Sequence, residues 1–139
     1  MFRRALFREI TKAFEGGDFR PLLEHLDDAV VWKSASRAPG PGRPGGDYHG
    51  RLGVVEVTSQ ICMVMTFHRF QLLEVLQDHH TLWGLFDTLV SPSDHQAEPL
   101  NYETALRIRF NGDRIAEIQS FFDTAQLTQY LSSAVETPR

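Results

Sequence analysis

Two strands joined by a tight turn are encoded by residues 100–123, LNYETALRIRFNGDRIAEIQSFFD. Apolar or mixed side chains occupy every second position, which is the period of a strand with one covered face. They are Tyr102, Thr104, Leu106, Ile108 and Phe110. Glu103, Arg107 and Arg109 take the opposite face, and Asn111-Gly112 tolerates the positive φ angles of a hairpin turn. The stretch therefore predicts an antiparallel sheet at the C-terminal end, and the question becomes what this sheet covers.

Length and composition narrow the class of protein. A chain of 139 residues with 42% hydrophobic and 11% aromatic content suits one packed domain, and a net charge of -4 gives no electrostatic reason to bind nucleic acid. No apolar run approaches the roughly 20 residues of a membrane span, and the start MFRRALFREI lacks the apolar core of a signal peptide. We therefore expect no membrane partner and a cytoplasmic location. Cys62 is the only cysteine, so an internal disulfide is impossible, and its apolar neighbours favour a packed thiol.

Helices are expected in the first part of the chain. Residues 3–14 carry apolar side chains at helical spacing, and a Gly-Gly pair then ends the run. Asp18 is well placed to cap a second, short helix through Leu26. A first strand is expected at about residues 29–34, so the chain begins with two helices and one early strand.

The middle of the chain combines a loop, a helix and strands. Residues 36–50, SRAPGPGRPGGDYHG, lack a hydrophobic period and predict a surface loop that could act as a lid. A heavily buried helix is expected at about residues 52–65, followed by strands at about residues 67–76 and 81–90. Asp123 caps a final helix through about Leu131. This order describes an α+β domain in which N-terminal helices cover one face of a curved antiparallel sheet.

Three segments resemble the nuclear transport factor two-like superfamily, particularly its SnoaL-like and ketosteroid-isomerase-like branch. They are FREITKAFEGGDFRPLLEHLDDAVVW, the glycine at Gly50 that opens a helix, and RFNGDRIAEIQSFFD. The resemblance covers nearly the whole chain and implies a single SnoaL-like domain over residues 1–139. It also implies a cone-shaped sheet around an apolar pocket, a homodimer, and a function among isomerases, cyclases, dehydratases, epoxide hydrolases and proteins that only bind.

Asp87 is the candidate catalytic residue. In WGLFDTLV it shares one strand face with Trp83, Leu85 and Leu89, so an inward orientation would place a carboxylate among apolar side chains. Desolvation would raise its pKa and suit it to act as a general acid or base. On the other parity Asp87 and Trp83 point to solvent and the alternate residues face inward. A run that is apolar on both faces leaves both readings open.

The catalytic sets of two branches are incomplete. The ketosteroid isomerase branch has a catalytic tyrosine and two catalytic aspartates. The positions that resemble them in this chain are Ile10, Lys33 and Leu106, so that catalytic set is absent. Where limonene-epoxide hydrolase has its Asp-Arg-Asp set, only Asp87 survives, and Ser120 stands in place of the second aspartate. A slip of one residue on the first strand would bring Trp32 and Ser34 into the pocket instead of Lys33.

Several polar and aromatic side chains are candidates for substrate binding. Tyr102 and Ser120 lie on the apolar parities of adjacent strands, and both could present hydroxyls to a ligand or be satisfied wall residues. Tyr48 ends the predicted loop and could supply a proton donor at the pocket mouth, or lie on the surface. Trp32 could stack on a flat ligand or pack in the core, and Trp83 would line the pocket together with Asp87.

We expect neither a metal nor another cofactor. His79 and His80 are adjacent, so on a strand they point to opposite faces, and no spaced histidine partner occurs. The sequence thus predicts a domain that binds a small apolar metabolite and performs proton-transfer chemistry on it as an isomerase, cyclase or dehydratase. The alternative is a non-catalytic module that binds a small ligand or dimerises.

Overall fold

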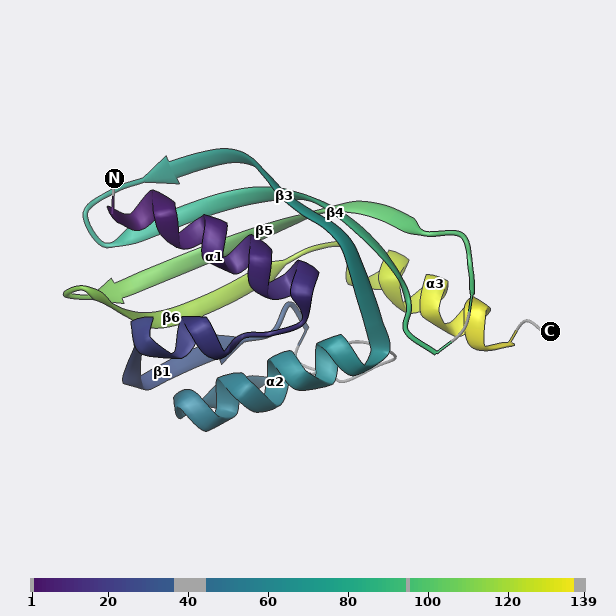
Figure 1. Ribbon diagram of the computed structural model, residues 1–139, viewed down its shortest axis with the longest axis horizontal. Helices are drawn as coiled ribbons and strands as arrows, with labels where there is room; N and C mark the ends of the chain where they lie inside the picture. Colours follow the sequence, from purple (N-terminus) through teal and green to yellow (C-terminus); the bar gives the residue numbers. More distant parts are fainter. Residues whose placement is uncertain (1, 37–44, 95, 137–139) are drawn as a thin grey trace.

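The computed structural model describes residues 2–36, 45–94 and 96–136 (Figure 1). The helices and strands are α1 (Phe2–Gly16), the 3-10 helix η1 (Arg20–His25), β1 (Leu26–Lys33), β2 (Asp47–His49), α2 (Gly50–Val64), β3 (Met65–Gln77), β4 (Thr81–Pro92), β5 (Leu100–Asn111), β6 (Arg114–Phe121) and α3 (Thr124–Glu136). The six strands form one curved, open sheet in the order β2-β1-β6-β5-β4-β3. Helices α1 and α2 pack on one face of the sheet, so the predicted α+β architecture with covering N-terminal helices is confirmed.

The first strand departs from the predicted antiparallel order. It starts at Leu26 and pairs in parallel with β6, Trp32 lying opposite Ile118. The other edge of β1 pairs in antiparallel register with β2, which the sequence did not predict because Asp47–His49 falls at the end of the Pro- and Gly-rich loop. Residues 37–44 of that loop lie outside the described residues. The predicted hairpin is confirmed: β5 and β6 pair around a turn in which Gly112 has a φ of 62°.

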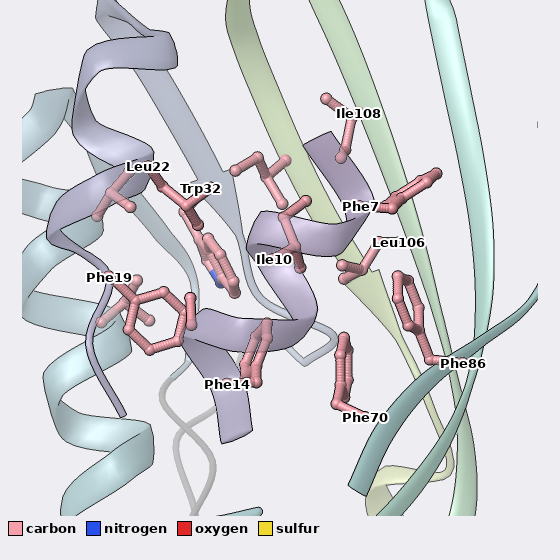
Figure 2. Close-up of a cluster of buried hydrophobic side chains, with 14 of the residues drawn as sticks. Phe7, Ile10, Phe14, Phe19, Leu22, Trp32, Phe70, Phe86, Leu106 and Ile108 are labelled. Carbon is pink, nitrogen blue, oxygen red and sulfur yellow. The ribbon is translucent and has the colours of Figure 1, made fainter. Parts of the chain in front are cut away.

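Aromatic side chains from three elements form the centre of the core (Figure 2). Phe70 of β3 stacks on Phe14 of α1 and on Phe86 of β4, with ring centroids 4.3 Å apart in both pairs. Phe7 of α1 meets Phe86 edge-on at 5.4 Å and lies against Gly84. These contacts fix α1 across the strands, and they decide which face of β4 is inside.

The inner face of β4 is formed by one set of alternating residues, all of them buried: Leu82, Gly84, Phe86, Thr88 and Val90. The outer face therefore carries the other set, which includes Trp83 and Asp87. The inward orientation that a catalytic Asp87 requires is wrong for this chain, because α1 packs its phenylalanines against Gly84 and Phe86. No described helix is long and apolar enough to cross a membrane.

Candidate ligand-binding site

A small cavity lies between the inner face of the sheet and the ends of α1 and α2. Its volume is about 50 Å³, enough for a few water molecules by the usual measure of about 10–15 Å³ for each. Figure 2 shows four of the lining residues, Phe14, Trp32, Phe70 and Leu106. The full lining is Phe14, Trp32, Ser34, Ala35, Ile61, Met65, Phe67, Phe70, Tyr102, Thr104, Leu106, Ser120 and Phe122.

The alternation of side chains along the strands places the polar residues of this lining on the cavity side. On β5, Tyr102 and Thr104 alternate with the outward-facing Asn101, Glu103 and Ala105, as the period of two requires. On β6, Ser120 pairs with Leu106 of β5 and shares its inner face. Trp32 is 4% exposed at the end of β1, and Ser34 follows it by two residues, so both face the cavity.

Three hydroxyl groups in the cavity wall have no protein partner in the described part of the chain. The Ser34 Oγ is buried without a hydrogen bond, and no hydrogen bond joins the hydroxyl of Tyr102 or Ser120 to another described residue. The Thr104 hydroxyl differs, because it lies 2.9 Å from the Thr88 hydroxyl and is satisfied by it. Buried hydroxyls usually have partners, and of the three groups the Ser34 hydroxyl is the fully buried one; the Tyr102 and Ser120 hydroxyls are free to form hydrogen bonds with a molecule in the cavity.

The described residues of the cavity wall carry no charge. They include no Asp, Glu, His, Lys or Arg, and burial raises the pKa of the Tyr102 phenol. Tyr102 is therefore a neutral hydrogen-bond donor and acceptor over the whole physiological range. What this lining can do chemically is to exclude water and to form hydrogen bonds with a neutral molecule.

Asp87 lies on the outer face of the sheet, so its side chain points away from the cavity. Its Oδ2 accepts a hydrogen bond from Arg69 Nε at 2.7 Å, and its Oδ1 accepts one from Asn101 Nδ2 at 2.7 Å. The hydrogen bond from Asn101 and the charge of Arg69 lower the pKa of Asp87, the reverse of the shift that a general acid in an apolar pocket needs. The Nζ atom of Lys33, at a position where the ketosteroid isomerase branch has an aspartate, lies 3.3 Å from Glu117 Oε2 on the outer face.

Trp83 and Tyr48 also lie apart from the cavity lining. Trp83 is on the outer face, where its ring stacks on Phe121 with centroids 5.8 Å apart and Arg107 lies over both rings. Tyr48 is half-buried on β2, packed against the core and close to Gly53 of α2. The structure thus brings Trp32, Tyr102 and Ser120 of the predicted site residues together.

The phenylalanines of the wall were not predicted as site residues. Phe14, Phe67 and Phe70 have the sequence pattern of ordinary core residues, and nothing in the spacing distinguishes them. Thr104 could have been found, since it follows Tyr102 by two residues on the same strand face. Within the ranges that the structure describes, no group of three His, Cys, Asp or Glu side chains is arranged to hold a metal ion.

Comparison with solved structures gives the class of fold. An NTF2-like protein from Burkholderia pseudomallei K96243 is 21% identical, with 91% of this chain and 94% of that chain covered and a TM-score of 0.75. TerC, co-crystallised with polyporic acid, is 15% identical, with 86% of this chain and 90% of that chain covered and a TM-score of 0.72. An NTF2-like protein from Anabaena variabilis ATCC 29413 is 16% identical, with 85% of this chain and 84% of that chain covered and a TM-score of 0.66.

At these identities the likeness is one of fold. The chain has the NTF2-like fold, and the resemblance of its sequence to that superfamily is confirmed at this level. No family model matches the sequence, and no curated protein matches it significantly.

Proposed function

We propose that this protein binds a small, neutral, largely apolar molecule in the inner cavity, and that the molecule carries a hydroxyl or carbonyl group. The observation that carries the proposal is a set of three hydroxyls without a partner among the described residues, those of Ser34, Tyr102 and Ser120, in a mostly apolar wall. A fully buried hydroxyl without a partner, as at Ser34, costs about 1–3 kcal/mol. A ligand that supplies the missing hydrogen bonds would recover part of that cost.

The chemistry of the wall selects against charged ligands. Burying an ion requires a partner of opposite charge, and no charged side chain lines the cavity in the described ranges of the chain. General acid or base catalysis needs a group that titrates near neutral pH. Among the lining residues that the structure describes, the one titratable group is Tyr102, whose pKa is raised by burial. The site therefore favours binding over the proton-transfer chemistry that we expected of Asp87.

The cavity must widen to admit a ring. A cavity of about 150 Å³ binds benzene in a well-studied apolar core, and this one measures about 50 Å³. Met65 lies in the wall, and its unbranched side chain has three rotatable bonds with which to adapt. The co-crystal of TerC with polyporic acid supports the proposal that this fold accommodates a ligand.

Tryptophan fluorescence tests the proposal directly. The chain has two tryptophans, so Trp83→Phe leaves Trp32 in the cavity wall as the one reporter. Benzyl alcohol, toluene and benzoate share a ring and differ in the group attached to it. We expect benzyl alcohol to change the Trp32 emission saturably, with toluene about tenfold weaker, as the loss of about one hydrogen bond implies. Benzoate should not saturate the signal.

Matched variants separate the cavity from the outer face. Ser34→Ala and Tyr102→Phe should each reduce the preference for benzyl alcohol over toluene, and Asp87→Asn should leave binding unchanged because its carboxylate lies on the other face. Equal affinity for benzyl alcohol and toluene would show that the hydroxyls do not select the ligand. Tighter binding of benzoate, or a loss of binding in Asp87→Asn, would contradict the proposal.

A further inference from the structure

A second cavity lies between the first half of α1, the end of η1 and the turn that joins β5 to β6. Figure 1 shows the start of α1 and this turn at the end of the sheet away from α3. The volume of the second cavity is about 150 Å³, against about 50 Å³ for the inner cavity. No residue of the described ranges lines both cavities, so the second cavity is a separate place for a ligand.

The floor of the second cavity is apolar. It consists of Leu6 of α1, Phe110 of β5 and Ile115 of β6, and all three side chains are buried. A cavity of about 150 Å³ binds benzene in a well-studied apolar core. The floor and the volume together therefore suit one ring, or a branched chain of similar size, without any change in the surrounding structure.

The mouth of the second cavity is acidic. Glu9 of α1 and Asp113 of the turn line it, the first with a side chain 41% exposed and the second exposed. The imidazole of His25, at the end of η1, is the third polar group of the lining. Two carboxylates and one imidazole give this lining a negative charge whether or not His25 is protonated. Arg114, which follows in the chain, donates a hydrogen bond to the backbone carbonyl oxygen of Glu24 at 3.0 Å.

The His25 imidazole has a buried nitrogen without a hydrogen bond. Its Nε2 atom lies 2.7 Å from Glu9 Oε2, but this contact lacks the geometry of a hydrogen bond, and no other described residue supplies one. Buried polar atoms in folded proteins nearly always have a hydrogen-bond partner. A polar group of a ligand at the mouth of the second cavity would provide the partner that this nitrogen requires.

We infer that the second cavity binds a small organic ammonium ion with a compact apolar body. An ammonium group has three N–H donors, and the mouth offers it the carboxylates of Glu9 and Asp113 and the Nε2 atom of His25, in the tautomer that carries its proton on Nδ1. The apolar body lies on the floor, where it is removed from water. The two carboxylates repel an anion, and a neutral alcohol forms no ion pair with them.

Isoleucine methyl NMR reports on the two cavities separately in one spectrum, because Ile115 lines the second cavity and Ile61 lines the inner one. We expect benzylammonium to shift the Ile115 methyl resonances saturably, with a Kd of the order of 1 mM or below, and to leave those of Ile61 in place. At Ile115, benzyl alcohol should bind at least about tenfold more weakly, and benzoate should not saturate. The ligand proposed for the inner cavity is measured at Ile61, so the failure of one proposal is distinguishable from the failure of the other.

Removal of charge at the mouth tests how the ammonium group is recognised. Glu9→Gln and Asp113→Asn keep the size of each side chain, and each should weaken the binding of benzylammonium about three- to fivefold, as partly exposed ion pairs imply. The double variant should bind it about tenfold more weakly or worse. Glu103→Gln is the matched control, since it removes an exposed carboxylate on the outer face of the sheet and should leave binding unchanged. If Glu9→Gln does not fold, Asp113→Asn in the exposed turn carries the same test.

A second ammonium compound distinguishes a free small molecule from the side chain of a protein. The methylamide of acetyl-lysine carries the same charge on a slender chain, and it should bind at least about fivefold more weakly than benzylammonium, because it places less apolar surface on the floor. The inference is overturned if benzylammonium leaves the Ile115 resonances unshifted, or if benzyl alcohol or the lysine compound binds there as tightly. Unchanged binding of benzylammonium to folded Asp113→Asn would overturn it as well.

Discussion

Gly84 allows α1 to lie directly on the sheet, and replacing it with alanine should destabilise the protein by steric conflict. A Cβ atom at this position would lie 2.7 Å from Phe7 Cζ and 2.9 Å from Phe86 Cε1. Carbon atoms in contact normally lie about 3.5–4.0 Å apart. Phe7 is 1% exposed and Phe86 is 0% exposed, so neither ring can turn aside without displacing other core side chains.

The expected magnitude follows from two opposing effects. Overpacking a core typically costs about 1–3 kcal/mol, and removing a glycine from a strand recovers up to about 1 kcal/mol. We therefore expect Gly84→Ala to lower the free energy of unfolding by about 1–2 kcal/mol. For a domain of this size, that corresponds to a melting temperature lower by about 3–8 °C.

Urea unfolding followed by circular dichroism measures this cost, and a double-mutant cycle identifies its cause. Phe7→Leu removes two of the three ring atoms that the new methyl group would meet and leaves Phe86 Cε1. In that background Gly84→Ala should therefore cost less than in the parent, which gives a coupling of about 1 kcal/mol between the two positions. Gly16→Ala is the matched control, because a Cβ atom there meets nothing within 4 Å. The reasoning is refuted if Gly84→Ala is as stable as Gly16→Ala in the parent background.

Two further predictions concern hydrogen bonds. Thr88→Val and Thr104→Val should each lower the free energy of unfolding by about 1–3 kcal/mol, because each leaves the other buried hydroxyl without its 2.9 Å partner. In urea unfolding, the double variant should lose less free energy than the sum of the two single losses. Simple additivity of the two losses would contradict this. Asn101 and Arg69 lower the pKa of Asp87 in the folded protein. Their pairing with the carboxylate therefore stabilises the fold at every pH above the ordinary pKa of an aspartate. This stabilisation is lost as the pH falls through the lower pKa of the folded state. Asp87→Asn should therefore be less stable than the parent by about 0.5–1 kcal/mol near neutral pH, and the difference should close below about pH 4. A difference that persists unchanged in acid would argue against the ion pair as its source.

The local patterns of the sequence predicted most elements of the fold because each depends on short-range physics. The hairpin around Gly112 follows from alternation and turn chemistry, and α1 follows from helical spacing. The parallel pairing of β1 with β6 could not be predicted in the same way. It joins segments near the two ends of the chain, and no local period specifies a partner so far away.

The site was predictable only where a strand had one clearly apolar face. Tyr102 and Ser120 met that condition and line the cavity. Trp83 and Asp87 did not, because β4 is apolar on both faces and the outer apolar residues pack against neighbouring strands. The choice between the faces depends on the contact of Phe7 with Gly84, a tertiary contact that the sequence of β4 alone does not encode.

The pairing of β1 with β6 also sets the order in which the binding cavity can be completed. One wall comes from Trp32 and Ser34, near the beginning of the chain, and the adjoining wall comes from Ser120 near its end. Contacts between such distant segments close a large loop and slow folding. During synthesis on the ribosome, the wall of the cavity therefore stays incomplete until β6 has emerged, and the ligand that we propose could bind there only after that step.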